Sequence, residues 1–176
     1  MRRLIFAASV LISADVFAFT DQLTTERIIN DNKAFIQFMD VAVTNFGEKQ
    51  KEDFFAVYQD HFNGEVAFLQ SEYKRAFHKV YASQKKDVKL FDTVLSDYYL
   101  EESKDILDRM APFVIKSKNS PARLYLSLGY RDRALSGSVK RAADASHPRL
   151  YSYNLSQFLE AIKLCRRSMR YSFLAV

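Results

Sequence analysis

The sequence predicts an all-α protein of five to seven helices, arranged as an irregular bundle or as stacked helix hairpins. Only four Gly and three Pro occur in 176 residues, so turn formers are few. Apolar residues recur at steps of three and four over long segments, which is the period of an amphipathic helix. Aromatic residues make up 14% of the chain, and we expect interdigitated Phe and Tyr side chains to fill the core.

Residues 1–18 have the pattern of a secretory signal peptide. Arg2 and Arg3 form a basic start, residues 4–13 are an apolar run, and a cleavage site follows at Ala18. An acidic residue ends the run well short of the ~20 apolar residues that a membrane span needs. We therefore expect export to a bacterial periplasm, with no transmembrane helix after cleavage. The alternative is that the segment is an apolar first helix of the folded domain.

Residues 19–176 have the length of one domain and are predicted to form a single α-helical domain. Its charge is uneven, because residues 19–120 carry 14 basic and 17 acidic side chains, whereas residues 121–176 carry ten basic and three acidic ones. The domain thus has an acidic part and a basic part. This asymmetry indicates either an anionic partner or attraction between the two parts.

Three helices are expected in the first half of the domain. Gly47 follows the first helix, and the turn signal Asn63-Gly64 is expected to end the second. The polar stretch at residues 85–87 then breaks the apolar rhythm after the third. The predicted helices cover residues 24–46, 48–62 and 65–84.

A fourth helix is expected over residues 98–115, with Ser96 or Asp97 as its N-cap. Pro112 removes a backbone donor, so this helix should kink or end near Ala111. A polar linker then separates the acidic part from the basic part.

The basic part is predicted to contain two long helices joined by a His-Pro turn. Linker residues 116–120 end with Ser120 as an N-cap, and Pro121 follows at the first helical position, where its missing N–H is tolerated. The fifth helix is expected over residues 121–145. The last helix is expected to begin at residue 150 and to continue to the end of the sequence.

Three features of these two helices bear on their packing. Gly129 and Gly137 lie within the fifth helix and either permit close helix contact or break the segment. Cys165 lies on the apolar stripe of the last helix, so we expect a buried thiol. The sequence ends in apolar residues 173–176 without a stop signal, so the same domain or a partner is expected to cover the last turn.

Motifs for catalysis, metal binding or cofactor binding are not found in the sequence. His61 and Glu65 lie four residues apart, but the turn expected between them would separate their side chains. Glu101, Asp105 and Asp108 share a helical face and are predicted to be solvated. We therefore expect neither an enzyme nor a metal or cofactor site.

The strongest functional signal is a set of basic residues interleaved with tyrosines on the last two helices. The basic residues of the last helix are spaced three, four and seven apart, so they form one cationic stripe on a single helix face. Arg predominates, and its planar guanidinium suits carboxylates and phosphates. The alternative is a solubilising face that the acidic part partly neutralises. Eight side chains are the candidate partner-binding residues: Arg131, Arg133, Lys140, Arg141, Lys163, Arg166, Arg167 and Arg170.

Residues 122–145, ARLYLSLGYRDRALSGSVKRAADA, resemble a tetratricopeptide-type repeat. The resemblance rests on the aromatic Tyr125, on Leu128 with the glycine after it, on the later alanines, and on the proline turn at Pro148. It implies helix hairpins that stack into a peptide-binding or scaffolding surface.

Two functions are compatible with these expectations. The first is an exported, non-catalytic interaction or scaffold protein that docks a protein or envelope partner through its basic C-terminal helices. The second is reversible binding to an anionic membrane or cell-wall polymer, with an affinity that salt weakens. Nucleic acid is not an expected partner in a secretory compartment. The sequence leaves the oligomeric state open.

Overall fold

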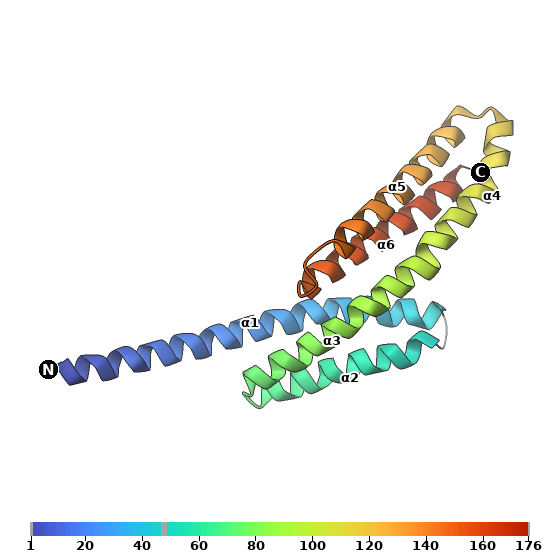
Figure 1. Ribbon diagram of the computed structural model, residues 1–176. Coiled ribbons are helices and arrows are strands. Elements are labelled where there is room, and N and C mark those ends of the chain that lie inside the picture. Colours follow the sequence, from blue (N-terminus) through green and yellow to red (C-terminus); the bar gives the residue numbers. More distant parts are fainter. Residues whose placement is uncertain (1, 47–48, 176) are drawn as a thin grey trace.

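The computed structural model describes the backbone of residues 2–46 and 49–175 and the side chains of residues 22–45 and 50–175. Every element in this part of the chain is helical (Figure 1), which confirms the all-α class and the expected number of helices. The elements are α1 (Arg2–Phe46), α2 (Lys49–Leu69), α3 (Tyr73–Val94), the π-helical segment η1 (Leu95–Leu100), α4 (Glu101–Ser117), α5 (Ser120–Asp144) and α6 (Tyr151–Leu174).

Helices α1, α2 and α3 pack against one another at the N-terminal side of the molecule (Figure 1). Their core is partly aromatic, as expected. The Phe91 ring of α3 is fully buried and meets two rings of α1: Phe35 edge-on, with the ring centroids 6.2 Å apart, and Phe38 stacked at 5.7 Å. Such ring pairs add to the stabilisation that burial of apolar area gives.

A continuous helical rod of α3, η1 and α4 leads from this unit into the C-terminal half (Figure 1). The backbone is right-handed helical at both junctions. The expected N-cap at Ser96 or Asp97 is therefore wrong, because both residues lie inside η1. A π-helical turn widens the helix without interrupting it, so these polar residues do not start a new element.

Helices α5 and α6 form a hairpin that packs against α4 and η1, and α6 also contacts α3 (Figure 1). Leu155, Phe158 and Ile162 of α6 belong to the same buried cluster as Phe91 of α3 and Met39 of α1. One continuous core thus connects the N-terminal helices with the C-terminal hairpin.

The predicted turn at Asn63-Gly64 is wrong, because α2 continues through both residues to Leu69. Gly64 is buried, and a Cβ there would lie 2.5 Å from Val80 Cγ2 on α3. The glycine therefore serves close packing of two helices. The chain turns instead after Leu69, where Ser71 adopts a φ of 63°.

Two further helix ends that the sequence predicts do not occur. Residues 85–87 continue α3, because Lys85 and Lys86 face solvent while Asp87 points into the core. Helix α4 does not end near Ala111 but runs through Pro112 to Ser117, and the alternative of a kink there stays a prediction. Pro112 lies on the exposed side of α4, where water can satisfy the carbonyl group that lost its N–H partner.

A polar linker does separate α4 and α5, but it comprises only residues 118–119 of the expected residues 116–120. Lys118 adopts a left-handed conformation with a φ of 56°, which ends α4. The N-cap of α5 is Asn119 and not Ser120, since the Asn119 side chain accepts a hydrogen bond from the Ala122 N–H at 3.3 Å. Pro121 lies in the first helical turn, as expected.

Helix α1 begins at Arg2, so the helix expected over residues 24–46 is the second half of a longer one. The N-terminal segment is thus helical, and the side chains of its residues 2–21 lie outside the described part. A helix is compatible with both interpretations of this segment, so the signal peptide stays a prediction. Within the described chain, no helix has the combination of length and apolar character that crossing a membrane requires.

Candidate partner-binding surface

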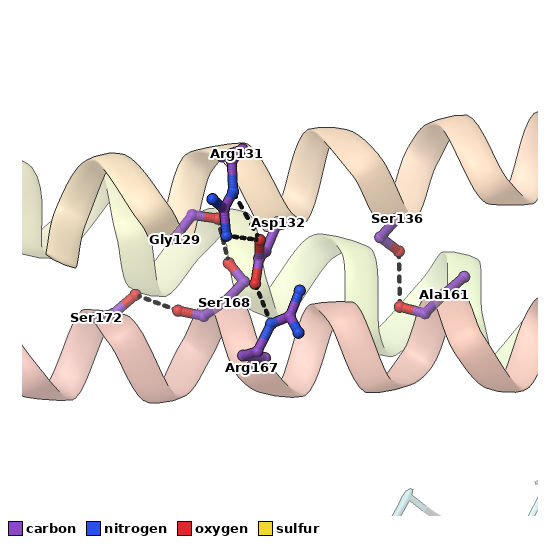
Figure 2. Close-up of polar contacts among 8 residues, drawn as sticks. All are labelled: Gly129, Arg131, Asp132, Ser136, Ala161, Arg167, Ser168 and Ser172. Atoms are coloured by element: carbon purple, nitrogen blue, oxygen red, sulfur yellow. Dashed lines mark hydrogen bonds and ion pairs between the residues drawn. The ribbon is translucent and has the colours of Figure 1, made fainter. Parts of the chain in front are cut away.

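Helices α5 and α6 approach closely because small residues line the contact between them (Figure 2). The Ser136 hydroxyl donates to the carbonyl oxygen of Ala161 at 2.8 Å, and the Ser168 hydroxyl donates to that of Gly129 at 2.8 Å. A Cβ at Gly129 would lie 3.3 Å from the Ser168 carbonyl oxygen of α6 and 2.7 Å from Leu107 Cδ2 of α4. Gly129 thus permits the close contact, and α5 is not broken there or at Gly137.

A buried carboxylate joins the two helices at the centre of this contact (Figure 2). Asp132 of α5 accepts hydrogen bonds from Arg131 Nε and Nη2 at 3.1 and 2.9 Å, and from Nε of Arg167 on α6. Burial alone would raise the pKa of Asp132, but the hydrogen bonds from the two guanidinium groups lower it below its ordinary value. Asp132 is therefore ionised at neutral pH and draws two candidate residues together.

The four basic residues of α6 are all exposed, as their spacing predicts. Arg167 is paired with Asp132, and Lys163 lies 3.6 Å from Glu160 in an exposed ion pair. Arg166 and Arg170 form no ion pair with any residue that the structure describes. Exposed pairs such as Lys163–Glu160 are weak, so the outer face of α6 keeps most of its positive charge.

The other candidates on α5 lie away from this face. Lys140 is largely buried between Asp92 of α3, at 2.7 Å, and Asp144, at 2.9 Å. Arg133 is half-buried and donates to the carbonyl oxygen of Leu100 at 3.4 Å. Arg141 is exposed and bonds to a serine on its own helix. The structure therefore brings together Arg131 and the four basic residues of α6, but not these three side chains.

His61 and Glu65 are brought together, contrary to expectation, because α2 continues between them. His61 Nε2 lies 3.5 Å from Glu65 Oε1, and His61 Nδ1 lies 3.2 Å from Nδ2 of Asn32 on α1. Burial lowers the pKa of His61, and the nearby Lys33 adds to this effect, while Glu65 opposes it. The imidazole is therefore neutral at pH 7 and belongs to a buried polar cluster.

The sequence interpretation missed the remaining members of this cluster on α3. The Asn32 amide donates to Ser83 Oγ at 3.0 Å, and Ser83 donates to the Val57 carbonyl oxygen at 2.8 Å. Asp87, one turn further along, is buried and neither of its carboxylate oxygens has a hydrogen-bond partner in the described structure. Burial raises the pKa of Asp87 to about 8. The sequence did contain a signal for this cluster, because Ser83 and Asp87 are polar, lie four residues apart and fall on the apolar stripe of α3.

The remaining residues that the sequence singled out are metal-ligand types, three carboxylates of α4 and one cysteine. The described residues contain no group of three or more His, Cys, Asp or Glu side chains that would hold a metal ion. Glu101, Asp105 and Asp108 are exposed, which confirms a solvated face. Cys165 is buried, as predicted, and its thiol lies 3.1 Å from the Ser136 hydroxyl.

The apolar end of the sequence is only partly covered by the domain. Ala175 is buried in a small cluster with residues of α4 and α5. Phe173 and Leu174 are 64% and 51% exposed. Helices α5 and α6 form a hairpin, and the resemblance of residues 122–145 to a tetratricopeptide-type repeat stays a prediction.

A comparison with models of known protein families yields a match. The family model described as surface protein adhesin OmpL37 matches residues 19–176. No curated protein and no solved structure matches the chain. Because the family model spans nearly the whole sequence, the chain belongs to the family of the surface protein adhesin OmpL37.

Proposed function

We propose that this chain is an exported, non-catalytic adhesin that binds a protein partner through the basic face of α6, with Arg131 of α5 at its edge. The family supports an adhesive role at the cell surface. The packed helices hold the basic side chains of α6 in place on one face of the domain. We call this surface, formed by Arg131, Lys163, Arg166, Arg167 and Arg170, the basic face.

The observation that carries the proposal is the uneven neutralisation of charge. Arg166 and Arg170 are exposed on one side of α6 without an ion pair in the described structure, and the sequence has no acidic residue after Glu160. Lys140, by contrast, is largely buried and lies between two carboxylates. The basic face therefore offers guanidinium groups that are free to bind.

An acidic protein surface is the partner chemistry that suits this face. Guanidinium groups bind carboxylates through two parallel hydrogen bonds, and several such groups on one rigid helix define a pattern of spacing. Complementary charge also speeds the first encounter between the two proteins. We accordingly expect an association that weakens as the salt concentration rises.

Export is the second part of the proposal. The family match begins at residue 19, directly after the predicted cleavage position, which supports a mature chain of residues 19–176 that passes through the periplasm to the cell surface. N-terminal sequencing of the protein from cells should begin at Phe19. External protease should degrade the protein on intact cells, while a periplasmic marker survives. Unprocessed protein in the cytosol would refute this part.

The binding experiment uses a charge reversal that leaves the fold intact. Arg166→Glu combined with Arg170→Glu changes the basic face without touching the Arg167–Asp132 pair. Lys74→Glu combined with Lys85→Glu makes the same change in net charge on exposed positions of α3 and is the matched control.

Proteins captured by the wild-type chain from an envelope extract are identified and purified, and the affinity of each for the variants is then measured. We expect the α6 variant to bind at least about tenfold more weakly than the control. Equal affinity of the two variants would refute a role for the basic face.

A further inference from the structure

The far end of the C-terminal half carries exposed apolar side chains that the proposed adhesin function does not use. The end of α4, the start of α5 and the end of α6 meet there (Figure 1). A small buried cluster that includes Val114, Ala122 and Ala175 holds the three segments together. Packing between the three segments therefore holds this end, which we call the tip, together.

Five large apolar side chains project from the tip into solvent. Phe113 is 70% exposed, and the others are between half and two-thirds exposed. They come from all three segments that the buried cluster holds together. The side chains are Phe113, Ile115, Leu124, Phe173 and Leu174.

The charged side chains that the structure describes at the tip are basic. Lys116 at the end of α4, Lys118 in the turn and Arg123 in the first turns of α5 are exposed. The sequence has no acidic residue between Asp108 and Asp132. The tip therefore combines an apolar surface with a rim of positive charge.

We propose that the tip inserts shallowly into an anionic lipid bilayer. Apolar side chains that reach the boundary between headgroups and acyl chains, with basic residues around them, are the arrangement by which proteins bind such a surface without spanning it. A second copy of the chain fits less well, because two tips would bring their basic rims together. Lysines and an arginine at the rim complement the negative charge of the lipid headgroups.

This proposal is independent of the basic face of α6. The tip residues named above do not include any of the residues of that face. The Arg166→Glu and Arg170→Glu variant therefore retains the whole tip, and the two proposals are tested separately.

A single tryptophan reports on insertion directly, because the natural chain contains none. Phe113→Trp places the reporter at the tip. Phe55→Trp places it on α2, where Phe55 is 64% exposed, and is the matched control. Each full-length variant is mixed with vesicles of phosphatidylcholine alone or of phosphatidylcholine with phosphatidylglycerol.

We expect the emission of the Phe113→Trp protein to shift to shorter wavelength with the anionic vesicles, and brominated lipid to quench it. The Phe55→Trp protein should show neither effect. The absence of a shift at the tip, or equal shifts for both proteins, would overturn the proposal. A shift that needs no vesicles and grows with protein concentration would show self-association and would also overturn it.

Substitutions then test the two components of the tip. Phe113→Ser with Phe173→Ser removes apolar surface, and Lys116→Glu with Lys118→Glu removes positive charge. In vesicle sedimentation we expect each pair to weaken binding at least about tenfold, because both components contribute. Phe55→Ser is the control for the first pair and Lys85→Glu for the second. Binding equal to that of the controls would contradict the proposal, and circular dichroism confirms that each variant is folded.

Discussion

Arg167 of α6 donates a hydrogen bond from Nε to the carboxylate of Asp132 on α5, and that carboxylate is completely buried (Figure 2). The Arg167 side chain itself is half exposed. One residue of the basic stripe therefore fastens the hairpin together, whereas its neighbour Arg166 faces solvent. On the same helix, Arg167 thus contributes to the stability of the hairpin, whereas Arg166 is placed to contact a partner.

Replacing Arg167 with Gln is expected to destabilise the hairpin. The buried carboxylate of Asp132 would lose one of its two cationic partners. The free energy of unfolding should therefore fall by about 1–3 kcal/mol, with the exposure of the guanidinium group favouring the lower end of this range. Chemical denaturation followed by circular dichroism measures this free energy. Arg166→Gln is the matched control and should change the free energy of unfolding by no more than about 0.5 kcal/mol. Equal effects of the two substitutions would argue against the role assigned to Arg167.

The two glycines of α5 should respond to alanine in opposite directions. A Cβ at Gly129 would lie 2.7 Å from Leu107 Cδ2 and 3.3 Å from Ser168 O, so Gly129→Ala should cost about 1–3 kcal/mol. A Cβ at Gly137 meets only the end of the Arg141 side chain at 3.6 Å. Gly137→Ala should therefore stabilise the protein by about 0.5–1 kcal/mol. Thermal unfolding of the two variants compares them, and a stabilising Gly129→Ala would contradict the packing described.

Asp87 should make the protein less stable as the pH rises. Its pKa is raised to about 8 in the folded chain, from an ordinary value of 3.8, so the folded state holds a proton that the unfolded state has released. The free energy of unfolding should fall by up to about 1.4 kcal/mol per pH unit between these two values and then level off. Asp87→Asn removes this dependence.

The measurement for Asp87 is the difference in unfolding free energy between variant and wild type as a function of pH. We expect Asp87→Asn to be little different near pH 4 and clearly more stable above pH 8. Asp97→Asn, at an exposed position of η1, is the control for loss of one carboxyl group. A difference that does not change with pH would mean that Asp87 is ionised in the folded protein.

Cys165 should react with thiol reagents only when the protein unfolds. Its side chain is buried and burial raises the pKa of the thiol, although the neighbouring hydroxyl groups of Ser136 and Ser103 partly oppose this. A chromogenic disulfide reagent should label native protein far more slowly than denatured protein. Cys165→Ser combined with Ser127→Cys, at an exposed position of α5, supplies a reactive control. Fast labelling of the native wild-type chain, or a disulfide-linked dimer on a non-reducing gel, would contradict the buried position.

Local patterns were sufficient to predict several parts of the molecule. Helical spacing indicated the all-α class and placed Lys163, Arg166 and Arg170 on one exposed face. The polar linker before Pro121 was recognisable because polar turn residues and a proline at the start of a helix act within a few residues. These features depend on interactions between near neighbours in the chain.

Residues distant in sequence decided the rest. Glycine is less favourable than alanine inside a helix by about 1 kcal/mol. The close packing of α3 against Gly64 outweighs this cost, and α2 continues through the residue. Asp132 and Arg167 are 35 residues apart, so no local pattern reveals that one basic residue of the stripe holds the hairpin together. The burial of Asp87 and the assembly of the tip likewise depend on which helices meet. Spacing along one helix predicts which side chains share a face, but only the packing of helices determines what that face meets.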